Sequence, residues 1–304
     1  MVDVSISIAS WNTRELTKQC IESIYMETKK HRFEIIVIEN GSTDGSAEMI
    51  KKNFPEVILI ENKENVGFGG AHNQAFGVSK RRYNLILNSD TIILDRAIDK
   101  MVDFLEKNSD VAVVTCLLLN PDKTVQHFVD TFPTIRNQFL YRIPYFERHL
   151  KGEVNFDYSR QQEVENFTGA CYTIRRKVID EIGTFDKDLF AYMEETTWFY
   201  KMKKKGLKLI YYPEPKIIHY GGASTKTWEQ KHIWFYMNML TFFKKNYGYP
   251  YLVLVKLYVS LSNILELCKV PFLWILPKTK RIKKERDKST LAWTLLKINL
   301  FKSV

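Results

Sequence analysis

Short apolar runs alternate with helix-like segments along the first 120 residues of the chain. Residues 4–9 form an apolar run of strand length, and the segment 14–28, with Thr13 as its N-cap, has a helical pattern. The same alternation predicts strands at 33–39, 57–61, 83–87 and 111–117, helices at 46–53, 71–80 and 95–107, and a glycine-rich loop at 65–70. This order of elements is typical of a doubly wound α/β fold with a mostly parallel sheet.

The alternation is lost between residues 120 and 165. Three prolines and many aromatic residues in this region predict an extended segment or a lid over one face of the sheet. Regular patterns then return, and they predict strands at 167–175 and 207–212 and helices at 176–182 and 196–205. An acidic stretch at 192–195 precedes the second of these helices, and His219 falls in a polar loop that contains glycine.

The composition changes near residue 228. We therefore expect a main domain over residues 1–228 and a helical, basic C-terminal extension over residues 229–304. The extension contains an aromatic helix to residue 247, an apolar and helical stretch at 251–276, and a basic run at 278–284. An apolar surface helix beside clustered lysines favours an anionic bilayer, whereas a helix packed on the main domain with a solvated basic tail explains the pattern equally well.

Composition narrows the class of protein. The 304 residues are 45% hydrophobic, which permits one large α/β domain with an appendage. A net charge of +10 points to an anionic partner, which could be a nucleic acid, an acidic lipid or a phosphorylated substrate.

The four cysteines form no C-x-x-C pair and favour a reducing compartment. The N-terminus lacks a signal-peptide pattern, and charged residues interrupt the longest apolar run, so we expect a cytoplasmic protein without a simple transmembrane anchor.

Several predicted strands end in polar residues. Asn88-Ser89-Asp90 follows the strand at 83–87 and would deliver a carboxylate suited to Mg²⁺ or Mn²⁺, although the tripeptide alone also suits a simple turn. Ser10-Trp11-Asn12 and Glu39-Asn40 end two other strands, and Gly67–Gly70 follow a third. Because ligands bind at the carboxyl ends of parallel strands, these endings together predict a nucleotide cleft. The glycines lack the G-x-G-x-x-G spacing of a dinucleotide fingerprint.

Taken in order, these motifs resemble a family-2 glycosyltransferase with an A-type nucleotide-sugar-binding fold. The resemblance covers about residues 4–245 and rests on the segments Ile6–Asn12, Val37–Gly45 and Asn65–Asn73 and on Asn88-Ser89-Asp90 in the place of the D-x-D motif. Phe190–Glu195 and Tyr212–Ser224 are similar to the acidic and histidine motifs of a bacterial rhamnosyltransferase-like branch.

The resemblance implies an inverting transfer, in which an acceptor hydroxyl attacks the anomeric carbon as the nucleotide diphosphate leaves. It implies that Glu195 or Glu194 is the catalytic base and that Asp90 binds Mg²⁺ or Mn²⁺ with the help of His219. The residues expected to hold the nucleotide or to shape its cleft are Ser10, Asn12, Glu39, Asp44, Gly67, Asn73 and Asn88. Asp44 could instead only cap the next helix, and Glu39 could be held in its own turn.

The chain departs from the family pattern at three of these positions. Glu194-Glu195 stands where Glu-Asp is common, which leaves the base open between the two. Glu39 replaces an aspartate, and Asn88 replaces the first D-x-D carboxylate. These changes keep a second interpretation open, namely a weak or inactive membrane-associated scaffold of the same fold. A sugar nucleotidyltransferase and a nucleic-acid binder are further alternatives, of which the second rests on charge alone.

The expected donor is dTDP-rhamnose or a UDP-sugar, and the expected acceptor is a hydroxyl of a glycan or a lipid-linked carrier in bacterial surface polysaccharide synthesis. We expect an anionic membrane surface as a further partner, at the inner face of the cell membrane, and no nucleic acid. A homodimer is compatible with the sequence.

Overall fold

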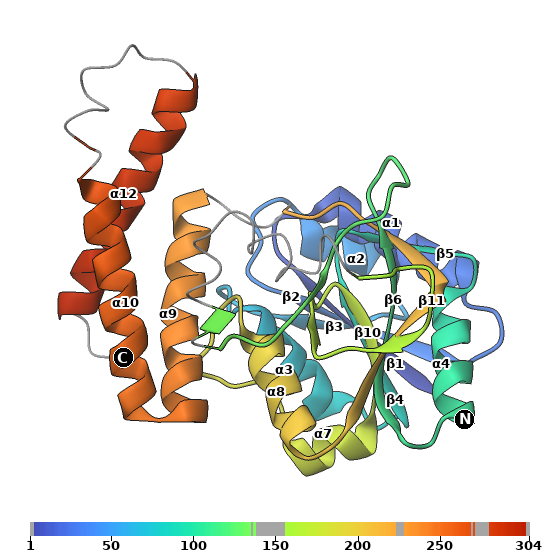
Figure 1. The fold of residues 1–304 in the computed structure, drawn as a ribbon. Helices are drawn as coiled ribbons and strands as arrows, with labels where there is room; N and C mark the ends of the chain where they lie inside the picture. Colours follow the sequence, from blue (N-terminus) through green and yellow to red (C-terminus); the bar gives the residue numbers. More distant parts are fainter. Residues whose placement is uncertain are drawn as a thin grey trace. The chain divides into compact units, whose positions relative to one another are not determined.

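A computed structural model describes residues 3–134, 136–137, 156–222, 228–268, 270 and 280–301. These residues form two compact units, which are treated separately below (Figure 1). The first unit contains the described residues up to 132 and those from 156 to 222. The second contains the three C-terminal helices and the short segment around Pro133.

A mixed sheet forms the centre of the first unit. Its strands among the described residues are β1 (Val4–Ser10), β2 (Phe33–Glu39), β3 (Ile58–Glu61), β4 (Tyr83–Asn88), β5 (Thr91–Leu94), β6 (Val111–Leu119), β8 (Gln162–Glu163), β10 (Cys171–Arg175) and β11 (Lys208–His219). The spatial order is β3-β2-β1-β4-β10-β6-β11-β5, with β8 paired to β11. β5, β8 and β10 run against their neighbours and the remaining strands are parallel, which confirms the expected mostly parallel α/β sheet.

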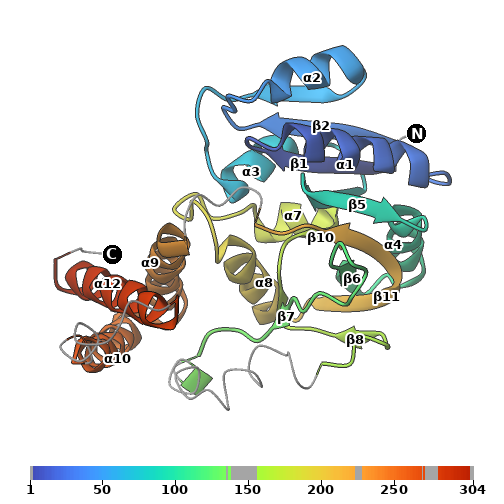
Figure 2. The ribbon, with the colours of Figure 1, turned by 90° about the horizontal axis from the view of Figure 1, so that it is seen from above.

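Helices cover both faces of this sheet, as Figure 2 shows from above. They are α1 (Arg14–Glu27), α2 (Ser46–Asn53), α3 (Phe68–Val78), α4 (Ala97–Lys107), α7 (Arg176–Ile182) and α8 (Glu194–Lys204). α4 lies on one face, where the sulfur of Met101 accepts a hydrogen bond from Thr173 of β10. α8 lies on the other face, where the rings of Phe199 and Tyr172 pack edge to face. A two-stranded sheet of β7 (Val129–Asp130) and β9 (Asn166–Phe167) adjoins α8.

The sequence pattern was wrong at several element boundaries. β5 was not expected, and α3 begins at Phe68, so three residues of the expected glycine loop lie inside a helix. The expected strand at 167–175 is divided into β9 and β10, and β11 extends far enough that His219 is its last residue instead of lying in a loop. Thr13 precedes α1 but makes no side-chain capping bond, because its hydroxyl pairs with other hydroxyl groups.

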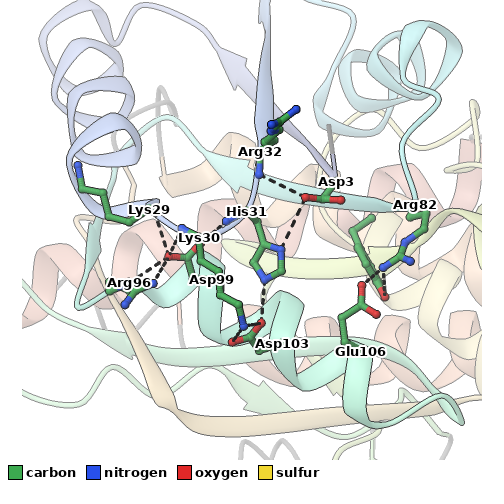
Figure 3. A network of polar contacts seen from close by, with 11 residues as sticks. Asp3, Lys29, Lys30, His31, Arg32, Arg82, Arg96, Asp99, Asp103 and Glu106 are labelled. Carbon is green, nitrogen blue, oxygen red and sulfur yellow. Dashed lines mark hydrogen bonds and ion pairs between the residues drawn. The ribbon is translucent and has the colours of Figure 1, made fainter. Parts of the chain in front are cut away.

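A charged network lies at the amino-terminal edge of the sheet, opposite the carboxyl ends of the parallel strands (Figure 3). Asp99 of α4 is 2% exposed and accepts N–H bonds from Lys29, Lys30 and His31 in the turn between α1 and β2. Burial alone would raise the pKa of Asp99, but these bonds and the Arg96 guanidinium bring the pKa below its ordinary value. The network therefore ties α1 and β2 to α4.

Three long helices make up most of the described part of the second unit. They are α9 (Trp228–Tyr247), α10 (Tyr249–Leu267) and α12 (Lys280–Phe301), and each packs on the other two. Asn299 of α12 donates to the carbonyl of Lys256 at 3.3 Å and to the hydroxyl of Ser260 at 3.1 Å, which fixes α12 against α10. Residues 271–279, which include the end of the expected apolar stretch and the start of the basic run, lie outside the described residues.

One helix of the second unit, α10, is long and apolar enough to cross a membrane. The helix has 19 residues, contains two charged side chains, Lys256 and Glu266, and is mostly exposed within the structure. The sequence pattern disfavours a simple transmembrane anchor because Lys256, Glu266 and Lys269 interrupt the apolar run, and Lys269 lies outside the described residues. Length and composition alone do not separate a spanning helix from one that lies on a surface.

Candidate active site

The predicted site residues gather at one edge of the sheet in the first unit. β1 ends at Ser10, β2 at Glu39, β4 at Asn88 and β11 at His219, and these four strands run in the same direction. The carboxyl edge of parallel strands is where ligands bind in open α/β sheets. The expected convergence of strands β1, β2 and β4 is confirmed, and β11 adds the histidine.

Asp90 and His219 face each other at this edge. Asp90 follows β4, is 7% exposed, and has its Oδ1 atom 3.4 Å from Nε2 of His219. The side-chain nitrogen of Asn88 lies 3.2 Å from the same ring nitrogen. The backbone holds the pair together, because Tyr220 N–H donates to the Asp90 carbonyl and β5, directly after Asp90, pairs with the end of β11.

Gln126 fixes the other side of the histidine ring. Its Oε1 lies 2.7 Å from Nδ1 of His219, while its Nε2 donates to the His219 carbonyl at 3.2 Å and to Oδ1 of Asn120 at 3.1 Å. Because Oε1 only accepts, Nδ1 carries the ring proton. In the neutral ring, Nε2 then keeps a lone pair directed toward Asn88 and the Asp90 carboxylate, and this is the arrangement of a metal ligand with an oriented second shell.

The donor atoms fit Mg²⁺ or Mn²⁺. A carboxylate oxygen close to an imidazole lone pair is electrostatically unfavourable unless a proton or a metal ion lies between them, and both donor atoms suit a divalent ion bound there. No group of three or more His, Cys, Asp or Glu side chains that could hold a metal occurs within the described part of the chain. Two protein ligands suit an ion that keeps several waters and completes its shell with substrate phosphates.

Glu194 and Glu195 form the start of α8, earlier than the sequence pattern predicted. The two residues before them, Tyr192 and Met193, have positive φ angles of 67° and 70°. This conformation is uncommon for residues other than glycine, and here it turns the chain sharply into the helix. The turn places both acidic side chains in the first helical turn, where a negative charge is favoured by the helix dipole.

The two carboxyl groups have different surroundings. Glu194 is 4% exposed and lies toward α3, where a Cβ atom built on Gly69 would be 3.6 Å from the Glu194 Cβ. Glu195 is only partly buried, and its Oε1 accepts a hydrogen bond from Gly169 N–H at 3.1 Å. The Oε2 atom of each has no hydrogen-bond partner among the described residues.

Burial raises the pKa of both groups above the ordinary value of 4.5. The effect is largest for Glu194, whose pKa is raised well above that value by burial and further by the charge of Glu195. For Glu195, burial is also the main cause, and backbone hydrogen bonds, including the one from Gly169, partly offset the rise. Burial therefore favours the protonated form of both carboxyl groups, and at Glu194 the charge of Glu195 acts in the same direction.

Gly169 and Ala170 link the acidic pair to the Asp90 turn. They lie between β9 and β10, and Ala170 accepts a hydrogen bond from Asn88 N–H at 2.9 Å. Gly169 donates to Glu195, and a Cβ atom at Gly169 would lie 3.1 Å from Oε1 of Glu195. Two successive residues thus connect the Glu195 carboxylate to Asn88, so both halves of the site meet at one part of the sheet edge.

Asn12 and Glu39 lie in two adjoining turns. Asn12 N–H donates to the Ser42 hydroxyl at 2.9 Å, and the Asn12 side-chain oxygen accepts from Thr43 N–H at 2.9 Å. Glu39 is 4% exposed and accepts from the N–H groups of Gly41 and Ser42. The alternative raised for Glu39, a carboxylate held in its own turn, is confirmed, and contact of either residue with a nucleotide stays a prediction.

Asp44 caps two helices at once. Its Oδ2 accepts from Arg14 N–H at the start of α1 at 2.9 Å, and its Oδ1 accepts from the N–H and the hydroxyl of Ser46 at the start of α2. Partial burial would raise the pKa of Asp44, but these hydrogen bonds outweigh it and the pKa is lowered. The capping role considered from the sequence is confirmed, and a contact with the nucleotide stays a prediction.

Ser10 is placed differently from what the sequence suggested. It is fully buried, and its hydroxyl pairs with those of Thr13 and Thr17 at 3.3 and 2.8 Å. A buried and paired hydroxyl does not fit direct contact with a ligand. We therefore correct the assignment of Ser10 from a nucleotide-binding side chain to part of the hydroxyl cluster that joins β1 to α1.

Gly67 and Asn73 attach the loop before α8 to α3. Gly67 has φ +80°, and a Cβ atom there would lie 2.0 Å from the carbonyl oxygen of Phe190. The Asn73 side chain donates to the Phe185 carbonyl and accepts from the Phe185 N–H, both at 2.9 Å. Since both ends of the Asn73 amide are occupied, this residue shapes the cleft through the loop and is not free to bind a nucleotide.

Sequence reasoning missed two residues of the site. Gln126 lies in the region where the pattern was lost, and no spacing to His219 identifies it because the two are 93 positions apart. Gly169 was included in a predicted strand, so its role as a donor to Glu195 was not expected. The Thr168-Gly169 pair inside an apolar run was the one available signal of a break.

The architecture and the site define a nucleotide-sugar transferase of the A-type fold. The profile of the family described as "Glycosyl transferase family 2" matches residues 5–183, which is more than half of the chain. The chain therefore belongs to glycosyl transferase family 2, whose members are inverting enzymes, and it is a nucleotide-sugar glycosyltransferase.

Two curated relatives indicate the range of this similarity. The chain is 22% identical over 208 residues to the N-acetylglucosaminyl-diphospho-decaprenol L-rhamnosyltransferase of Mycobacterium tuberculosis, covering 63% of this chain and 67% of the relative. It is also 22% identical over 231 residues to the O-antigen biosynthesis protein RfbC of Myxococcus xanthus. That match covers 73% of this chain but 18% of the much longer relative.

Two solved structures share the fold. The mannosyltransferase PcManGT from Pyrobaculum calidifontis, in complex with GDP-Man and Mn²⁺, superposes with a TM-score of 0.57 at 16% identity, covering 98% of this chain and 87% of that one. TarS from S. aureus gives a TM-score of 0.54 at 14% identity and covers 79% of this chain and 39% of that one. At these identities, the similarity supports the fold alone.

Proposed function

We propose that this protein transfers a sugar from dTDP-rhamnose or a UDP-sugar, with the help of Mg²⁺ or Mn²⁺, to a hydroxyl of a glycan or lipid-linked acceptor. The observation that carries the proposal is the connection of Glu195 to the Asp90 turn through Gly169 and Ala170. It brings a base and a metal-binding pair to one edge of the sheet. The rhamnosyltransferase and the O-antigen protein among the relatives favour the donor class and a role in bacterial surface polysaccharide synthesis.

Glu195 is the better candidate for the base. One of its carboxylate oxygens is held by Gly169 N–H, and the other is buried without a hydrogen-bond partner among the described residues. An acceptor hydroxyl that reaches this second oxygen would supply the missing hydrogen bond and could pass its proton there. A raised pKa also suits the role, because a base whose pKa is closer to neutrality accepts a proton more readily. Glu194 lies toward α3 and is buried, which favours a structural role.

In the proposed reaction, the acceptor oxygen forms a bond to the anomeric carbon while the bond from that carbon to the diphosphate breaks. The acceptor proton moves to Glu195, and the nucleotide diphosphate leaves with the bonding electron pair. Asp90 and His219 would hold the divalent ion, with Gln126 orienting the ring. When bound, the ion neutralises negative charge that develops on the leaving diphosphate.

A thermal-shift panel of nucleotide sugars with and without Mn²⁺ identifies the donor. A ligand that binds only the folded protein raises its apparent stability by mass action, so the preferred donor should give the largest shift. We expect the shift to depend on Mn²⁺ and to be lost in Asp90→Ala. A Mn²⁺-independent shift that Asp90→Ala leaves unchanged would remove the metal assignment.

Paired variants test the base. Glu195→Gln should keep donor binding in the same thermal-shift assay and lower turnover by about 10² to 10⁴-fold, which is the usual contribution of general base catalysis. Glu194→Gln should keep most of the turnover. The reverse result would assign the base to Glu194, and binding without turnover in the wild-type protein would favour the inactive scaffold.

A further inference from the structure

The second unit exposes a continuous apolar face on α10. Six large side chains contribute to it, and we call them the outer face: Val253, Leu254, Leu257, Leu261, Ile264 and Leu265, each between 40% and 63% exposed. Their spacing of three and four residues places them on one side of the helix. Large apolar side chains gathered in this way on an otherwise soluble surface mark a site that another apolar phase covers.

The opposite side of α10 is packed inside the unit. Leu252, Val255, Val259 and Asn263 are at most 5% exposed, and they alternate with the outer face at helical spacing. α10 is therefore apolar on two sides, but only one of them has a protein partner among the described residues of this unit. The outer face contains no charged residue.

The net positive charge of the protein is concentrated in the same part of the chain, residues 229–304. Residues 229–304 contain 14 lysines and arginines but four aspartates and glutamates, which makes ten net positive charges. Residues 1–228 contain 31 of each kind and are neutral. The whole excess of +10 thus belongs to the part of the chain that carries the outer face, and a strong positive charge beside an apolar surface is complementary to an anionic bilayer.

We propose that the second unit binds an anionic lipid bilayer, with α10 lying in the plane of the membrane surface and its outer face inserted among the lipid chains. This inference goes beyond the proposed sugar transfer and does not depend on it. The protein would act at a membrane surface, where a lipid-linked acceptor is concentrated.

An orientation in the plane fits the contacts of α10 better than a span does. Its packed side contains the buried Asn263, and Asn299 of α12 bonds to the Lys256 carbonyl and the Ser260 hydroxyl. A span would carry these polar contacts and α12 into the hydrocarbon with it. α12 begins with the charged segment 280–288, which is incompatible with that environment.

Vesicle co-sedimentation of the full chain tests the proposal without any sugar substrate. We expect binding to vesicles of phosphatidylcholine with 30% phosphatidylglycerol, weak binding to pure phosphatidylcholine, and release at high salt. Leu257→Gln with Leu261→Gln should lower the partition coefficient by about tenfold or more, because it removes buried methyl and methylene groups from the lipid contact. Equal partitioning of this double variant would overturn the proposal.

A matched control uses exposed apolar residues of the first unit. Met26 and Val78 are 66% and 50% exposed, and Met26→Gln with Val78→Gln should leave vesicle binding unchanged. A second test variant replaces Lys280, Arg281, Lys283 and Lys284 by Gln, and it should weaken binding to the anionic vesicles by at least about tenfold. If this variant binds as the wild type does, the electrostatic part of the proposal is wrong.

Two further outcomes would also overturn the proposal. In the first, the wild type is a dimer in vesicle-free buffer, Leu257→Gln with Leu261→Gln converts it to a monomer, and neither form binds vesicles. The outer face would then be an interface between two copies of the chain. The second is wild-type protein that stays with the vesicles after an alkaline carbonate wash, since this indicates a span. Far-UV circular dichroism confirms that each variant is folded.

Discussion

The stability of Glu194→Gln as a function of pH tests the different roles of the two glutamates. The Glu194 carboxyl is 4% exposed, its Oε2 lacks a partner among the described residues, and burial with the nearby Glu195 charge raises its pKa well above 4.5. The folded protein therefore holds the Glu194 proton more tightly than the unfolded chain does. Gln has nearly the same shape as the protonated acid but cannot ionise.

The sign follows from proton linkage. Below pH 4.5, Glu194 is protonated in both states, and the wild type and Glu194→Gln should have similar free energies of unfolding. Above that pH, the unfolded chain ionises while the folded protein does not, so the wild type loses stability relative to the variant. The difference grows by up to about 1.4 kcal/mol per pH unit until the pH reaches the folded-state pKa.

Urea unfolding at pH 5, 6, 7 and 8 measures this difference. Above pH 5, we expect Glu194→Gln to gain stability on the wild type, with a slope of at most about 1.4 kcal/mol per pH unit for as long as the pH stays below the folded-state pKa of Glu194. The partly exposed Glu195 provides the control, because Glu195→Gln should show a smaller pH-dependent gain. A pH-independent difference, or a wild type that becomes the more stable protein as the pH rises, would refute the reasoning.

Three further predictions concern the residues that hold the site in place. Gln126→Leu removes the hydrogen-bond partner of the His219 ring and should weaken Mn²⁺ binding about 10 to 100-fold. Electron paramagnetic resonance with a nucleoside diphosphate present measures the Mn²⁺ affinity, and an unchanged affinity would contradict the orienting role of Gln126. Gly67→Ala should cost at least about 3 kcal/mol in urea unfolding, because its Cβ would lie 2.0 Å from a carbonyl oxygen. Gly77→Ala, with open space around it in the adjoining helix α3, should be neutral or stabilising, and equal effects of the two variants would exclude the close approach as the cause. Asp99→Asn should lower the free energy of unfolding by about 2 kcal/mol at pH 7. This loss should shrink as the pH falls through the lowered pKa of Asp99, and a loss that persists in acid would show that the Asp99 charge is not responsible.

The sequence predicted the centre of the parallel sheet because β1, β2 and β4 are short apolar runs that bury both faces. β2 and α2 have the predicted bounds, and β1 and β4 each extend one residue further, so the ends of β1, β2 and β4 could be placed at one edge before the structure was known. Asp90 could be placed at the same edge for the same reason. These inferences needed only local pattern and the rule that parallel strands end together.

The rest of the site depends on pairings that local pattern does not contain. β5 has four residues and is recognised only by its antiparallel pairing with β11, and that pairing is what brings His219 to Asp90. The break at Gly169 is likewise defined by a contact with Glu195, 26 positions away. Interactions at such separations are decided by tertiary packing, so propensity and periodicity along the chain do not reveal them.

The two glutamates that replace the aspartates common in this family are held in the same way, by backbone N–H groups. Glu39 reaches the N–H groups of Gly41 and Ser42, and Glu195 reaches the N–H of Gly169. At both positions the longer residue thus anchors its own carboxylate to a turn that contains glycine. The departures from the family pattern therefore keep an oriented carboxylate at the sheet edge, and this argues against the interpretation that they mark the loss of catalysis.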